Sequence, residues 1–208
     1  TELSSRIKPP AVAGLFYPQD PGELQQMIDQ LLDQATVEME PPKALIAPHA
    51  GYVYSGPVAA TAYATLQPIR HRIKRVVLLG PAHRVYLRGI ALSRADRFAT
   101  PLGMLEVDKD LRSRVAGYAQ VSFNDEAFAQ EHSLEVHLPF LQSVLDDFTV
   151  LPLVVGDITA GQVAEILQAV WGGDETLIIV SSDLSHYHDY ATACKLDSDT
   201  SIAIKSLQ

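Results

Sequence analysis

Three short apolar runs in this chain each lead into a loop that carries a histidine, and this repetition constrains the fold more than any other feature. Residues 44–47 lead into His49, residues 76–79 into His83, and residues 177–180 into His186. Such runs, too short for ordinary helices, are typical of strands buried on both faces of a parallel sheet. Parallel strands end at one edge of their sheet, where open α/β folds bind ligands. The three loops are therefore predicted to meet in one site.

Amphipathic segments alternate with these runs. Leu24, Ile28 and Leu31 recur at helical spacing. They follow Asp20, a residue type favoured at helix N-caps, and Pro21, which suits the first turn. Further helices are expected over residues 58–66, 108–116, 159–171 and 191–207, and further extended segments over residues 89–93, 98–107 and 148–155. Strands that alternate with helices predict an α/β fold with a mainly parallel central sheet flanked by helices.

The composition suits one globular domain, with 208 residues of which 47% are hydrophobic and 20% charged. A formal charge of −9 argues against a nucleic-acid partner, whose binding needs clustered Lys and Arg. No apolar run approaches the roughly 18 residues of a transmembrane helix, so no membrane partner is expected. Cys194 is the single cysteine, which excludes an intrachain disulfide and is compatible with a cytoplasmic protein.

A single loop histidine often shapes its turn by hydrogen bonding to the backbone. For His49, His83 or His186 taken alone, this structural role is favoured. Their predicted convergence reverses that preference, because neutral imidazole is the commonest metal ligand and the usual acid or base near neutral pH. The three residues are therefore candidates for a metal or proton-transfer site.

A second polar cluster contains Glu131, His132, Glu135 and His137. On a helix the two histidines would lie about 140° apart and could not bind one ion from one face, which excludes the zinc-protease motif. Two geometries stay open: a helix on which the two glutamates share a face, or an extended segment before a helix with Pro139 in its first turn. In both, the cluster can orient metal-bound histidines. A solvent-exposed helix face is the alternative.

Two further candidates lie beside the histidine loops. Asp183 follows the third apolar run and can be a third metal ligand, a hydrogen-bond acceptor that orients a ligand, or a helix N-cap. Tyr54, like Tyr52, follows His49 and either lines a pocket or packs in the core.

Four motifs together resemble the Memo family. They are APHAGYVYSG at residues 47–56, LGPAH at 79–83, EHSLEVHLPF at 131–140 and SSDLSH at 181–186. Prokaryotic members of this family are often called AmmeMemoRadiSam system protein B. The resemblance extends from about residue 7 to 190. It implies the α/β fold of the class III extradiol (LigB-like) dioxygenases, which open catechol-like rings with O2.

The resemblance also implies roles for individual residues. His49 and His83 match two metal ligands, and His186 matches the histidine that acts as acid and base in the dioxygenases. The implied metal is Fe(II), with Cu as the alternative. The third ligand, a cysteine in Memo proteins and a glutamate in the dioxygenases, belongs to a region beyond residue 208, and Cys194 does not match it. The chain is thus expected to be a single Memo-like domain, residues 1–208, without its C-terminal part.

Two functions are compatible with this resemblance. The first is a metal-dependent, dioxygenase-like oxidoreductase that acts on a small molecule. The second is a non-catalytic binding or signalling module that holds a peptide or small ligand in the same cleft. A third, weaker interpretation is metal-assisted hydrolysis with Glu131 or Glu135 as the base.

Overall fold

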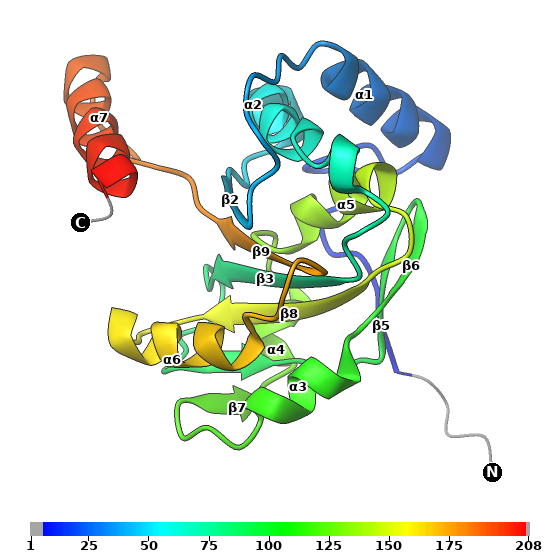
Figure 1. Ribbon diagram of the computed structural model, residues 1–208, viewed down its shortest axis with the longest axis vertical. Helices are drawn as coiled ribbons and strands as arrows, with labels where there is room; N and C mark the ends of the chain where they lie inside the picture. Colours follow the sequence, from blue (N-terminus) through cyan, green and yellow to red (C-terminus); the bar gives the residue numbers. More distant parts are fainter. Residues whose placement is uncertain (1–5, 207–208) are drawn as a thin grey trace.

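A six-stranded sheet organises residues 6–206, the part of the chain that the computed structural model describes (Figure 1). Its strands lie in the order β2 (Ala44–Ala47), β9 (Thr176–Ser181), β3 (Arg75–Pro81), β8 (Thr149–Val155), β4 (Ile90–Leu92) and β7 (Val121–Phe123). The first four strands are parallel, β4 runs antiparallel to β8, and β7 runs parallel to β4. The predicted mainly parallel α/β sheet is confirmed.

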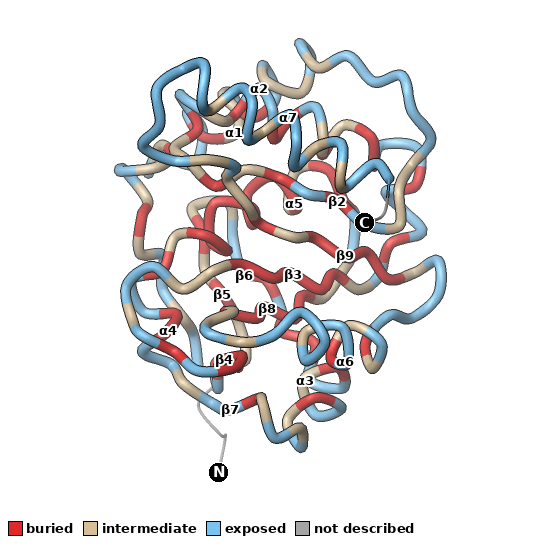
Figure 2. The backbone as a smooth tube through the Cα atoms, turned by 90° about the vertical axis from the view of Figure 1, so that its left-hand side faces the viewer, coloured by how far each residue is buried: buried red, intermediate tan, exposed pale blue. Residues whose placement is uncertain are grey.

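The alternation of side chains along the strands divides the core into two layers. In β3, Val76 and Leu78 face one hydrophobic cluster, and Val77 and Leu79 face the other. The helices α1 (Pro21–Asp33), α2 (Tyr52–Ala64) and α5 (Leu138–Val144) cover the first face, and α3 (Lys109–Val115) and α6 (Ala160–Val170) cover the second. Buried residues are accordingly concentrated along the central strands in Figure 2.

Side-chain caps fix the starts of three helices, and the first of them is the cap predicted at Asp20. Asp20 accepts a hydrogen bond from the N–H of Glu23 at the start of α1. Asp108 does the same for Leu111 in α3, and Thr159 forms a capping box with Gln162 in α6. Each cap satisfies N–H groups that have no partner within the helix, so these three boundaries follow from local sequence.

Smaller elements complete the fold. The extended segment predicted over residues 98–107 is a hairpin of β5 (Arg97–Thr100) and β6 (Gly103–Glu106), joined by β1 (Ile7–Lys8) in a second sheet. The remaining helices are η1 (Gln67–Ile69), α4 (Glu126–Ala129), η2 (Glu135–His137) and α7 (Tyr190–Ser206). The predicted end of the last helix, residue 207, lies outside the described residues. Across residues 6–206 no helix has both the length and the apolar character that a membrane crossing requires.

Helix α2 begins earlier than the sequence predicts. Its first residue is Tyr52 rather than residue 58, and Pro57 lies inside the helix. Proline removes one backbone hydrogen bond, normally made to the carbonyl four residues earlier. That residue is Val53, on the exposed face of the first turn, where water can replace the lost donor. Tyr52 therefore packs in the core from a helix, whereas Tyr54 is 85% exposed.

Strand β3 approaches the segment before η2 so closely at Gly80 that an added side chain would have to displace its neighbours. A Cβ atom at Gly80 would lie 2.7 Å from Leu134 Cδ2 and 2.8 Å from Ser133 Oγ. The Ser133 hydroxyl also donates a hydrogen bond of 2.8 Å to the Pro81 carbonyl. This close approach holds the segment that carries His132 against the strand that leads to His83.

Gly80→Ala is expected to lower the free energy of unfolding by about 1–3 kcal/mol, because the added methyl group must displace Leu134 and Ser133. Denaturant unfolding with a common m-value measures this. Gly161→Ala is the control, since no atom lies within 4 Å of a Cβ there. In the first turn of α6 that change should stabilise the protein by about 0.4–1 kcal/mol. A Gly80→Ala protein as stable as wild type would contradict the close approach.

Candidate metal centre

Three histidines meet at the carboxyl edge of the sheet. His49 follows β2 and His83 follows β3, while His132 comes from the segment between α4 and η2. Each offers a potential ligand atom, and these atoms lie within 4.8 Å of one another. The centroid of the His83 ring lies 5.1 Å from that of His49 and 4.6 Å from that of His132. The predicted convergence of the first two histidine loops is confirmed, and the arrangement can hold a metal ion.

The buried carboxylate of Glu131 fixes the orientation of His83. It accepts the backbone N–H of His83 over 2.5 Å and faces Nδ1 of the same residue at 2.8 Å. It also accepts the N–H groups of His132 and Ser133, both over 3.0 Å. Burial alone would raise the pKa of Glu131, but these hydrogen bonds outweigh it and hold the pKa below its ordinary value. The ionised carboxylate therefore makes His83 Nδ1 a donor and leaves its Nε2 lone pair free.

His49 is anchored from strand β9. Its backbone N–H donates to Asp183 Oδ1 over 2.7 Å, and its Nδ1 atom lies 2.7 Å from the Ser181 hydroxyl. These contacts follow from the register of parallel strands, which pairs Ser181 with Ala47. The ring is only 2% exposed, and burial lowers the pKa of His49 to about 4, against an opposing effect of Asp183. His49 is therefore a neutral imidazole at pH 7, the form that binds metals.

The environment of His132 fits a bound metal. Its Nδ1 atom is buried and has no hydrogen-bond partner among the described residues, and it lies 3.4 Å from Glu131 Oε1. Burial lowers the pKa of His132, opposed by Glu131, so this ring is neutral as well. Nitrogen ligands of one ion lie at most about 4.2 Å apart, so small ring rotations would suffice. The sequence analysis predicted that His132 helps to orient metal-bound histidines. In the structure it is itself one of the three histidines that could hold the ion.

The loop after β9 reaches the rim of the cluster. Asp183 Oδ2 lies 3.6 Å from His49 Nε2 and 3.7 Å from His186 Nε2. The helix N-cap interpretation of Asp183 is wrong, because the next helix begins at Tyr190 and Asp189 accepts hydrogen bonds at its start. The side chain of His186 is 52% exposed. Its predicted role as a proton-transferring residue is neither supported nor contradicted by this placement.

The two remaining candidates of the polar cluster point away from the three histidines. Glu135 accepts the backbone N–H groups of Ala11 and Val12 and the hydroxyl of Tyr17, so it fastens the N-terminal segment. His137 is buried beneath the site and contacts Tyr63 and Ser181. The solvent-exposed interpretation of this cluster is wrong, since both side chains are buried. Neither open geometry holds in full, because η2 lies between the loop and α5, although Pro139 does stand in the first turn of α5.

The sequence analysis missed the contact residues beneath His49. Ser181 closes β9 beside Ala47, and strand register is the signal that could have located it. Tyr63 lies in α2, and its hydroxyl is 2.8 Å from His137 Nδ1. No local pattern marks this pair, whose members are 74 residues apart.

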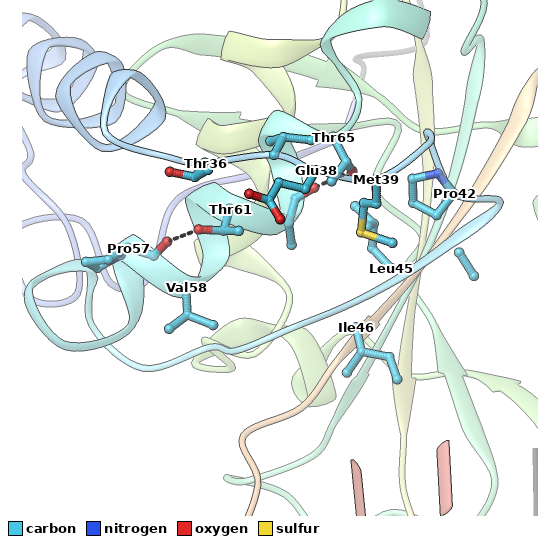
Figure 3. Close-up of a pocket in the computed structure, with 13 residues that line it drawn as sticks. Thr36, Glu38, Met39, Pro42, Leu45, Ile46, Pro57, Val58, Thr61 and Thr65 are labelled. Atoms are coloured by element: carbon cyan, nitrogen blue, oxygen red, sulfur yellow. Dashed lines mark hydrogen bonds between the residues drawn. The ribbon is translucent and has the colours of Figure 1, made fainter. Parts of the chain in front are cut away.

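An apolar cavity lies elsewhere. It has a volume of about 720 Å³ and lies between the linker after α1, edge strand β2 and α2 (Figure 3). Met39, Leu45 and Val58 line it, together with other mostly apolar residues. None of the candidate site residues lines this groove, so it is separate from the histidine cluster. Tyr54 does not pack in the core, since it is exposed on the first turn of α2, and it does not line this groove; its place in a pocket stays a prediction.

A family model for Memo-like proteins matches residues 8–208. The chain belongs to the Memo family. A MEMO1 family protein of Aquifex aeolicus is 39% identical over 196 residues, which cover 92% of this chain and 72% of that relative. One from Methanosarcina barkeri is 36% identical over 207 residues, which cover 97% and 76%. The predicted resemblance is thus confirmed, and the mostly parallel sheet flanked by helices agrees with the LigB-like fold of this family.

The two buried glutamates of this Memo-family segment provide a matched pair of variants. Glu131→Gln places an amide N–H₂ against N–H donors, so it should cost about 1–3 kcal/mol of stability. It should also weaken the binding of a divalent metal by about 10- to 100-fold, because His83 loses its carboxylate partner.

Glu135→Gln is the control for this prediction. It disturbs a buried carboxylate of similar environment that contacts Ala11, Val12 and Tyr17 instead of the histidines. It should lower stability comparably and leave metal affinity unchanged. Unfolding curves and calorimetric titration with Co(II) measure the two effects. Equal metal affinity of both variants would contradict the assignment of Glu131 to the metal centre.

Proposed function

We propose that this chain binds one non-haem metal ion between His49, His83 and His132 and uses it in a dioxygenase-like reaction on a small molecule. The orientation of the imidazole rings is the strongest support for this proposal. Two of the three imidazoles have their Nδ1 atoms engaged by protein groups, which leaves Nε2 as the free nitrogen. A histidine that served only to shape a loop would not need this arrangement on neighbouring rings.

Fe(II) is the metal we propose, with Cu as the alternative. Imidazole nitrogen suits iron, copper and zinc alike, so the preference for iron comes from the likeness to extradiol dioxygenases. His132 supplies a third imidazole within the chain. A further ligand from beyond residue 208 stays a prediction. We also propose a cytoplasmic location, since the exposed Cys194 is a free thiol, as is usual in reducing compartments.

Bound Fe(II) would supply the site with the capacity to bind O2 and a catechol-like substrate together. The residues of the chain position and protonate that substrate. His49 is enclosed, whereas 36% of the His83 side chain is exposed, so the side of His83 and His186 is the proposed entrance. His186 carries an imidazole, the side chain best suited to proton transfer near neutral pH. Asp183 lies between His186 and His49 and is placed to orient the first.

The metal site is tested by removing its ligands. Protein reconstituted anaerobically should bind about one Fe(II) per chain, and a His49→Ala, His83→Ala double variant should lose at least about 100-fold in affinity, more than an indirect contact contributes. Inductively coupled plasma mass spectrometry after gel filtration measures the bound metal. His71→Ala is the control, since His71 is exposed and lies before the amino end of β3. Undiminished metal in the double variant would refute the site.

The reaction is tested by oxygen uptake. Fe(II)-loaded protein should consume O2 with at least one member of a catechol panel, and His186→Ala should lower that rate by about 10²- to 10⁴-fold while the metal stays bound. An oxygen electrode and ring-opened product absorbance measure both. Replacing the neighbouring His188, also exposed, controls for general disturbance of the loop. Stoichiometric metal without uptake from any catechol would favour the non-catalytic binding module.

A further inference from the structure

A buried hydrogen-bond relay runs beneath the histidine cluster, and only its contact with His49 enters the proposed function. It joins His49 to Ser181, Ser181 to His137, and His137 to Tyr63 over distances of 2.7, 2.8 and 2.8 Å. All four side chains are buried. Their protons can be assigned from the distances and from the donors that each group possesses.

The assignment starts at Ser181. Its hydroxyl oxygen lies 2.6 Å from the backbone carbonyl oxygen of Ser133. Two oxygens this close share a hydrogen, and a carbonyl has none to give, so the Ser181 hydroxyl donates there. A serine hydroxyl carries a single hydrogen. At its contacts with His49 and His137 it can therefore only accept.

Both histidine tautomers follow from this. His49 Nδ1 and His137 Nε2 must carry hydrogens, because each faces an oxygen that accepts. The other nitrogen of a neutral imidazole holds a lone pair. For His137 this is Nδ1, where the Tyr63 hydroxyl donates over 2.8 Å. Every group in the relay is then satisfied, and reversing any one hydrogen bond leaves a buried polar group without a partner.

We propose that Tyr63, His137 and Ser181 are positioning residues that hold His49 in the Nδ1–H form and thereby direct its Nε2 lone pair at the metal. The inference rests on the proposed metal centre. Asp183 accepts the backbone N–H of His49 through Oδ1, and its Oδ2 lies 3.6 Å from Nε2, too far for a hydrogen bond, so the hydrogen bond of the ring is made to the relay. Tyr63 has no place in the cluster itself and acts through two intervening side chains.

The tautomers are measured in the metal-free protein, where no metal can impose them. Two-bond ¹H–¹⁵N correlation spectra of ¹⁵N-histidine-labelled protein at pH 7.5 distinguish Nδ1–H from Nε2–H. The expected result is Nδ1–H for His49 and Nε2–H for His137, with the solvent mixture for exposed His71. An Nε2–H form of His49 would overturn the proposal.

Metal affinity provides the second measurement. Ser181→Ala should weaken Co(II) binding by about 10- to 100-fold, as is typical for loss of a group that orients a metal-bound histidine. Ser181→Thr keeps the hydroxyl that faces His49 and should bind Co(II) more tightly than Ser181→Ala. Unchanged affinity in Ser181→Ala would overturn the proposal.

Tyrosine variants separate the relay from general stability. Tyr63→Phe keeps the ring stacked on Phe140, removes the donor to His137, and should weaken Co(II) binding by up to about 10-fold. Tyr52→Phe removes an equally buried hydroxyl that donates to the Val136 carbonyl, outside the relay. It should leave both the His49 tautomer and metal affinity unchanged. Equal effects of the two variants would overturn the proposal.

Failure of the proposal and failure of the metal centre give different results. Wild-type protein that binds no metal would refute the proposed function, while the ¹⁵N spectra would still decide the tautomer of His49. Wild-type protein that binds metal with His49 in the Nε2–H form would refute the relay and leave the metal centre intact.

Discussion

Burial of the segment from Glu131 to His137 is the constraint on which the site depends. The segment lies under the carboxyl edge of the sheet, pressed against β3 at Gly80. A buried charge or imidazole without a hydrogen-bond partner costs several kcal/mol, so each polar side chain of the segment needs its own partner. Glu131 pairs with His83, Glu135 accepts a hydrogen bond from the N-terminal segment, and His137 contacts Ser181 in the relay beneath His49.

His132 is the exception within this segment, and the exception fits a metal site. Its neighbours are satisfied by the protein, while its Nδ1 atom is buried without a hydrogen-bond partner among the described residues. A protein that needed only a stable core would gain by filling this position with an apolar ring. Retaining an unsatisfied imidazole beside two others is understandable where a metal ion completes its coordination.

The sequence was sufficient for those parts of the site that depend on strand ends. His49 and His83 follow apolar runs, and the rule that parallel strands end at one edge brings them together without any knowledge of side chains. His132 could not be assigned in this way, because its position depends on a turn and a short 3₁₀-helix that carry no periodic pattern. The start of α2 was predicted wrongly. Pro57 is typical of the first turn of a helix, but the helix already begins at Tyr52, whose aromatic side chain packs in the core.

The charges around the cluster favour the binding of a cation. An imidazole that binds a metal ion is neutral, so the three histidines would bring no charge, and burial already favours this form at His49 and His132. Glu131 and Asp183 place two carboxylates beside them. The guanidinium of Arg84, which acts on His132 together with Glu131 and Asp183, opposes the attraction of the two carboxylates for a cation in part. The imidazoles would thus supply the lone pairs and the two carboxylates the negative charge for a cation, in a site where His49 is almost wholly excluded from water and charges act strongly.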